Sequence, residues 1–188
     1  MCGIVGLFLK DKSLESKLGI LTNDMLATMC DRGPDSAGFA IYGQSTDGQS
    51  KITVQSATPD TDFKDLDKSL SKAIGANVTM QRKSNHAVLT MPLAKADAAR
   101  DAIKAGHPSL RIMATGSSIE IYKEVGYPTD VAKRFDLTKM SGTHAIGHTR
   151  MATESAVTTL GSHPFSTGAD ECLVHNGSLS NHNNLRRE

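Results

Sequence analysis

The sequence predicts an α+β protein in which short strands alternate with amphipathic helices and a middle segment forms a second α+β unit. Short apolar runs bounded by polar residues and glycine indicate strands at 2–9 and 36–42. Leucine and methionine at steps of three and four indicate a helix over 14–29. Over 50–126 the expected order is β-α-β-β-α-β-β, which fits a ferredoxin-like split unit plus one strand.

Composition argues against several classes of protein. The chain has 188 residues, 38% hydrophobic and 22% charged, so it can bury a core and is unlike a disordered segment. The net charge of +1 argues against a nucleic-acid partner, which would need a basic face. Apolar runs fall short of the ~20 residues of a membrane helix, and the start lacks the features of a secretory signal. We therefore expect a cytoplasmic protein without a membrane partner.

The cysteines and histidines give no metal or cofactor signature. Cys2, Cys30 and Cys172 are odd in number and no two have C-x-x-C spacing, which indicates neither a disulfide framework nor a zinc site. The seven histidines form no H-E-x-x-H motif, and the glycine-rich nucleotide-binding patterns are missing. We therefore expect no cofactor and a reducing compartment.

The remaining elements are expected in chain order. Ser13 is the expected cap of the first helix, which would end before Gly33. We expect helices over 63–74, 92–105 and 128–135, and strands near 52–54, 78–80, 87–91, 110–114, 119–125 and 145–149. The Thr- and Ser-rich stretch 153–169 predicts a long loop, 172–175 a short strand, and 181–188 the start of a helix.

Cys2 is the first candidate for chemistry because of its position. Methionine aminopeptidase removes Met1 before a small residue, which would leave Cys2 with a free α-amine. Such an amine has a pKa of ~7.7–8 and can act as a base beside the thiol, which attacks as the thiolate. Nucleophile and general base would then share one residue. The alternative is a buried strand cysteine that merely follows the start codon.

Asn176 and Gly177 form a second candidate. An asparagine amide beside a glycine N–H can donate two hydrogen bonds to an oxyanion, although Asn-Gly is also the commonest tight hairpin turn. His148 and His175 lie in strand-like runs. We interpret both first as core or supporting residues and only second as catalytic bases.

Arg150 and the corner over 32–38 complete the candidates. Arg150 follows a strand, and its planar guanidinium suits a carboxylate, although a surface ion pair would also account for it. The glycine-bounded corner is either an ordinary turn or a brace, in which Arg32 and Asp35 hold main chain near Cys2.

Five short sequence motifs occur in a fixed order along the chain. Each is common by itself, and only the set of five is specific for a protein family. They are Met1-Cys2-Gly3-Ile4-Val5-Gly6, Arg32-Gly33-Pro34-Asp35-Ser36-Ala37-Gly38, Gly147-His148-Thr149-Arg150-Met151-Ala152-Thr153, His163-Pro164-Phe165 and His175-Asn176-Gly177. This set resembles the class II glutamine amidotransferases, whose glutaminase domains are N-terminal-nucleophile (Ntn) hydrolases. The resemblance implies a four-layer αββα sandwich of antiparallel sheets.

The resemblance also implies a mechanism. The Cys2 thiolate would attack the side-chain amide of L-glutamine, with the α-amine of Cys2 carrying the proton and Asn176 and Gly177 forming the oxyanion hole. A γ-glutamyl thioester would form, ammonia would leave, and water would release glutamate. Arg150 would bind the substrate carboxylate and Thr153 and His163 would lie near it.

The resemblance assigns 1–49 and 127–188 to the amidotransferase domain and 50–126 to an α+β insertion. The family has an aspartate beyond the His-Asn-Gly block that binds the substrate α-amine. The sequence stops at Glu188, before such a residue, so we expect the domain to be truncated. The segment 151–162 would close over glutamine and keep ammonia from water.

In the length of the insertion and the sequence of residues 149–155, the chain most resembles the amidotransferase subunits of split glutamate synthases and N-methylglutamate synthases. The partners would then be ammonia-accepting synthase subunits in a hetero-oligomer, and the insertion would be a docking surface or a decorated edge. Two alternatives stay open. One is a non-catalytic, glutamine-sensing or structural subunit that keeps Met1, and the other is an Ntn hydrolase of a different amide.

Overall fold

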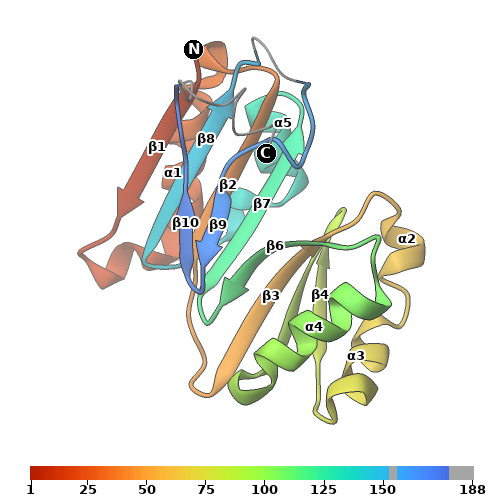
Figure 1. Ribbon diagram of the computed structural model, residues 1–188. Coiled ribbons are helices and arrows are strands. Elements are labelled where there is room, and N and C mark those ends of the chain that lie inside the picture. The colour runs from red at the N-terminus through yellow and green to blue at the C-terminus, as the bar shows by residue number, and fades with distance from the viewer. Residues whose placement is uncertain (153–155, 178–188) are drawn as a thin grey trace.

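The computed structural model describes residues 1–152 and 156–177, which form two packed units (Figure 1). The strands are β1 (Gly3–Phe8), β2 (Ser36–Tyr42), β3 (Gln49–Gln55), β4 (Thr79–Lys83), β5 (His86–Pro92), β6 (Arg111–Gly116), β7 (Ile119–Val125), β8 (His144–Arg150), β9 (Phe165–Gly168) and β10 (Glu171–Leu173). The α-helices are α1 (Leu18–Ala27), α2 (Pro59–Asp62), α3 (Leu66–Ile74), α4 (Ala96–Gly106) and α5 (Pro128–Arg134). None of these helices has the length and apolar character needed to cross a membrane.

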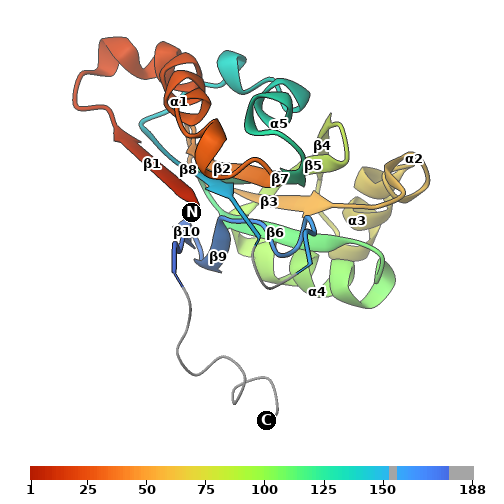
Figure 2. The same cartoon turned by 90° about the horizontal axis from the view of Figure 1, so that it is seen from above.

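The first unit is built on an antiparallel sheet with the strand order β1-β8-β2-β7. Figure 2 shows α1 and α5 on one face of this sheet and the β9–β10 hairpin on the other. Strand β2 is buried along its whole length because it has neighbours on both edges and both faces. The layers confirm the predicted mixed α+β class and are consistent with the four-layer sandwich of the Ntn fold.

The second unit is a sheet with the order β4-β5-β3-β6, against which α3 and α4 pack. Apart from the one-turn helix α2 between β3 and α3, the order of its elements is β3-α3-β4-β5-α4-β6, the ferredoxin-like arrangement that the periodicity predicts. The sequence analysis predicted that 119–125 is the last strand of this unit. In the structure this strand, β7, instead pairs with β2 of the first sheet along its whole length, from Ser36 opposite Val125 to Tyr42 opposite Ile119. The tight β6–β7 turn therefore joins the two sheets, and the boundaries at 50 and 126 stay a prediction.

Local details differ from the sequence prediction at three places. Asp11, and not Ser13, caps the first helical segment, because its Oδ1 accepts a hydrogen bond from the Ser13 N–H at 2.9 Å. That segment is a 3₁₀ helix up to Lys17, and the α-helix begins at Leu18. The predicted loop over 153–169 contains β9, and the helix predicted over 181–188 lies outside the described residues.

Asp170 joins the β9–β10 hairpin to the β6–β7 turn. Its carboxylate accepts hydrogen bonds from the main-chain N–H and hydroxyl groups of Ser117 and Ser118 and from the N–H of Ile119, at 2.8–2.9 Å. Burial favours the neutral acid, but the hydrogen bonds outweigh it and hold the pKa of Asp170 well below its ordinary value. Gly116 allows the close approach, since a Cβ there would lie 2.3 Å from an Asp170 oxygen.

We expect Asp170→Ala to lower the free energy of unfolding at pH 7 by about 2 kcal/mol, because five donors lose a charged acceptor. Since the folded-state pKa is lowered, this stabilisation is present above the unfolded value of ~3.9 and is lost as the pH falls below it. Urea unfolding at several pH values measures both effects. The exposed Asp101→Ala variant is the matched control, and equal losses in the two variants would contradict the role of Asp170.

Candidate active site

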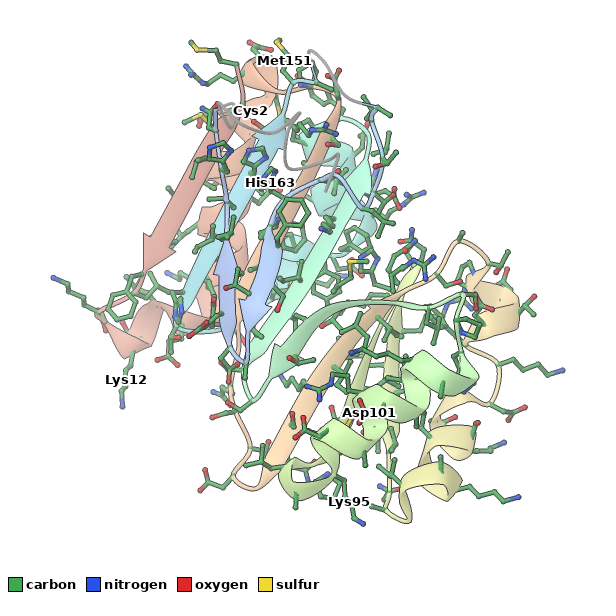
Figure 3. All side chains as sticks on the ribbon, in the orientation of Figure 1. Cys2, Lys12, Lys95, Asp101, Met151 and His163 are labelled. Carbon is green, nitrogen blue, oxygen red and sulfur yellow. The ribbon has the colours of Figure 1, made fainter. Side chains whose placement is uncertain are left out.

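The pairing of β1 with β8 sets the position of the chain start. Gly3 lies opposite Thr149, and its N–H donates to the Thr149 Oγ1 at 3.2 Å. A Cβ at Gly3 would lie 2.7 Å from that oxygen, so the approach requires glycine. The half-buried Cys2 thiol consequently lies 3.8 Å from the carbonyl oxygen of Met151. Figure 3 shows Cys2, Met151 and His163 at the same end of the first sheet.

Two predicted residues converge on the main chain of Cys2. The Asn176 amide donates to the Cys2 carbonyl oxygen at 2.9 Å, and the Arg32 Nε donates to the same oxygen at 3.4 Å. An asparagine amide has a second N–H, which this contact does not use. Gly177 follows in an exposed position, where a Cβ would lie 3.2 Å from the His175 Nε2. The structure thus brings residues 2, 32 and 176 together.

Asp35 and Arg150 lie at the exit of β8. The Asp35 N–H donates to the Arg150 carbonyl at 3.1 Å, and the Asp35 carboxylate accepts from the Ala152 N–H at 2.7 Å. The corner packs tightly there, since a Cβ at Gly33 would lie 2.4 Å from the main chain of β8. The Arg150 guanidinium donates to the Ala156 carbonyl at 3.2 Å. Asp35 therefore holds the segment after β8, whereas the contact with Cys2 itself comes from Arg32.

Three histidines are connected by a ring contact and a hydrogen bond near this end of the sheet: His148, His163 and His175. The His148 ring lies 4.4 Å from the His163 ring, and its Nε2 is 3.1 Å from the His175 carbonyl oxygen. Because a carbonyl only accepts, the hydrogen-bond network assigns the proton of His148 to Nε2. Burial lowers the pKa of His148 and of His163 to about 4, so both rings are neutral at pH 7. Thr153, the other expected pocket residue, lies outside the described residues.

Sequence reasoning missed Lys123, a buried lysine on β7. Its ammonium group donates to the carbonyl oxygens of Ser162 at 2.7 Å and Pro164 at 3.1 Å, the two residues on either side of His163. A signal was available in the strand pattern. Ile119, Ile121 and Lys123 alternate and share one face of β7, so a charged residue continues an apolar stripe.

No family model matches the chain. It is 63% identical over 188 residues to the glutamine amidotransferase-like protein GlxB of Rhizobium meliloti, a match that covers 100% of the chain and 62% of that protein. A Methanothermobacter thermautotrophicus protein, also named as a glutamine amidotransferase, is 33% identical over 99% of the chain and 64% of its own length. The chain thus spans about three-fifths of the length of these relatives. A shorter match, 32% identical over 43% of the chain and 14% of the relative, is to a glutamine–fructose-6-phosphate aminotransferase of Methanococcus maripaludis.

We expect the His148 and His163 imidazoles to titrate near pH 4 in the folded protein, because protonation would place a charge in a desolvated site. The lowered pKa means that the unfolded chain binds more protons between about pH 4 and 6.5, so stability falls as the pH drops through that window. Imidazole NMR titration measures the midpoints, with His148→Asn and His163→Asn assigning the signals. A ring that titrates near pH 6.5 would show that the site is more hydrated than its burial indicates.

Proposed function

We propose that this chain, which is similar over nearly its whole length to proteins named as glutamine amidotransferases or glutamine amidotransferase-like, forms the glutaminase part of a class II enzyme. One observation carries the proposal: the Asn176 amide lies 2.9 Å from the carbonyl oxygen of Cys2. The side chain proposed to stabilise an oxyanion is thus beside the proposed nucleophile. An ordinary Asn-Gly hairpin turn needs no contact with a residue 174 positions away, so this contact favours a shared site over a simple turn.

In the proposed reaction, the Cys2 sulfur attacks the side-chain carbonyl carbon of glutamine. The α-amine exposed by removal of Met1 takes the thiol proton and transfers it to the departing nitrogen, so ammonia leaves and a γ-glutamyl thioester remains. Water then cleaves the thioester to give glutamate and restores the thiol. The second N–H of Asn176 and the main-chain N–H of Gly177 would donate to the oxyanion in both steps.

Substrate recognition is proposed to lie along the exit of β8. Arg150 would bind the glutamine carboxylate with its planar guanidinium, with Thr153 and His163 beside it. The hydrogen bonds from Asp35 and Ala152 support this role, because they fix the main chain on both sides of Met151. A neutral His163 ring can donate one hydrogen bond and accept another, which suits contact with an uncharged carboxamide.

The ammonia would pass to a synthase subunit on another chain, as in split glutamate synthases. The 50–126 insertion would then lie beside a cytoplasmic hetero-oligomer interface, with 1–49 and 127–188 as the amidotransferase domain. The proposal rests on the resemblance of the five sequence blocks and on the glutamine amidotransferase names of the relatives. These relatives extend well beyond the length of this chain.

We expect Cys2→Ala to abolish glutamate release from glutamine, since the variant lacks the attacking sulfur. The diazo ketone 6-diazo-5-oxo-norleucine should label Cys2 in the processed protein, as peptide mass spectrometry would show. Cys172→Ala is the matched control, because that half-buried thiol contacts the Tyr42 hydroxyl and not the site. Normal turnover by Cys2→Ala refutes the proposal. A native protein that keeps Met1 and shows no turnover with its partner would support the glutamine-sensing or structural alternative.

We expect Asn176→Ala to lower kcat by about 10²–10³-fold, as removal of an oxyanion donor does in other acyl-transfer enzymes. The change in KM should be small, because the donor acts mainly on charge that develops in the transition state. Steady-state glutaminase kinetics measure both constants. Asn23→Ala, at a partly exposed position of α1, should leave both constants unchanged. An unaltered kcat in Asn176→Ala would remove that residue from the mechanism.

A further inference from the structure

Lys123 carries a charge in a desolvated part of the fold. Only 3% of its surface is exposed, and its ammonium group donates to three main-chain carbonyls, those of Ser162 at 2.7 Å, Pro164 at 3.1 Å and Leu160 at 3.4 Å. The Nζ also lies 4.3 Å from the centre of the Phe165 ring. Burial lowers the pKa of Lys123 to about 8. Because an ammonium has three donors, this one short segment uses its full hydrogen-bonding capacity.

The segment held by Lys123 contains His163. The His163 carbonyl packs against Gly38, which lies opposite Lys123 in the sheet, and a Cβ at Gly38 would be 2.2 Å from that oxygen. The His163 ring contacts His148, whose Nε2 donates to the carbonyl of His175. Asn176, whose amide contacts the Cys2 carbonyl, is the next residue, so the segment is connected through His148 and His175 to the candidate site.

Glu124 fixes the start of the same segment from the opposite face of β7. Its carboxylate accepts hydrogen bonds from the Thr159 hydroxyl and from the Asn85 amide, and it lies 3.5 Å from the Arg134 guanidinium. Only 8% of Glu124 is exposed. Consecutive residues of one strand thus bind 159–164 at both ends, with Glu124 at Thr159 and Lys123 at the carbonyls that follow.

The packing of β7 does not require a lysine at position 123. Ile119 and Ile121 fill the same face of β7, so an apolar side chain at position 123 would complete the stripe. A buried ammonium is costly unless its hydrogen bonds are made, and the segment supplies all three acceptors. The lysine and the segment therefore stabilise each other's position, because the carbonyls satisfy the buried ammonium and the ammonium holds the segment against the sheet.

We propose that Lys123 is a positioning residue for glutamine, which, together with Glu124, holds 159–164 in place so that His163 faces the substrate pocket. This inference rests on the proposed function. The three carbonyls that accept hydrogen bonds from Lys123 all lie in the segment after β8, and none belongs to Cys2 or Asn176. Its loss therefore weakens substrate binding and leaves the chemical groups in place.

The test is Lys123→Met in the full-length protein with Met1 removed. We expect KM for glutamine to rise by about tenfold while kcat changes by less than about twofold, the pattern of lost ground-state binding. Lys51→Met is the matched control, because Lys51 is a partly buried lysine that pairs with Glu120 at 2.8 Å and not with the 159–164 segment. The KM of this variant should equal that of the unmodified protein. An unchanged KM, or a fall in kcat alone, would overturn the proposal.

Two additions keep the test decisive. Thr159→Val removes the hydrogen bond to Glu124 from an accessible segment, and it should raise KM in the same direction even if Lys123→Met fails to fold. Calorimetric binding of glutamine in a Cys2→Ala background separates this inference from the catalytic proposal. If that background binds glutamine and Lys123→Met weakens binding, positioning stands even where the unmodified protein shows no turnover. Equal affinities would rule it out.

Discussion

The register of β8 between β1 and β2 is the constraint on which the rest of the site depends. Gly3 lies opposite Thr149 on one side, and Ser36 lies opposite Arg150 on the other. Both the chain start and the glycine-bounded corner therefore meet the exit of a single strand. A slip of one residue would move Cys2 by about 3.3 Å and turn the side chains of β1 to the opposite face. The burial of β2 on both faces opposes such a slip.

The strands and helices that could be predicted from the sequence are those whose own residues carry a clear hydrophobic pattern. Strands β1 and β2 are continuous apolar runs, and α3 and α4 carry regular apolar stripes, so local patterns were sufficient. Strand β9 has four half-exposed or exposed residues, and it exists because β10 pairs with it and Asp170 fixes the turn. A run of four residues gives no local sign of its partner strand, so the sequence alone predicts a loop there.

The same distinction holds for the candidate site. Cys2, Asn176 and Arg32 could be selected because their residue types and motif blocks carry specific chemistry, and the structure brings them together. Asp35 was selected for the same reason, yet its carboxylate binds Ala152, since the corner turns toward the end of β8. Lys123 has a local signal, a lysine in an apolar stripe, but its partners lie 37–41 positions away. A strand pattern shows that a charge is buried and does not show which main-chain oxygens receive it.

Polar side chains as well as apolar ones connect the two sheets. His86 of β5 lies against the rings of Tyr122 and Phe135, and burial lowers its pKa to about 3, so it enters this core as a neutral ring. Beside it, Glu124 accepts hydrogen bonds both from the β4–β5 turn and from the segment after β8. Removing either donor leaves a buried carboxylate undersatisfied, at a cost of about 1–3 kcal/mol. The ferredoxin-like unit is therefore part of the support of the loop that the proposed mechanism uses, because one carboxylate satisfies donors from both.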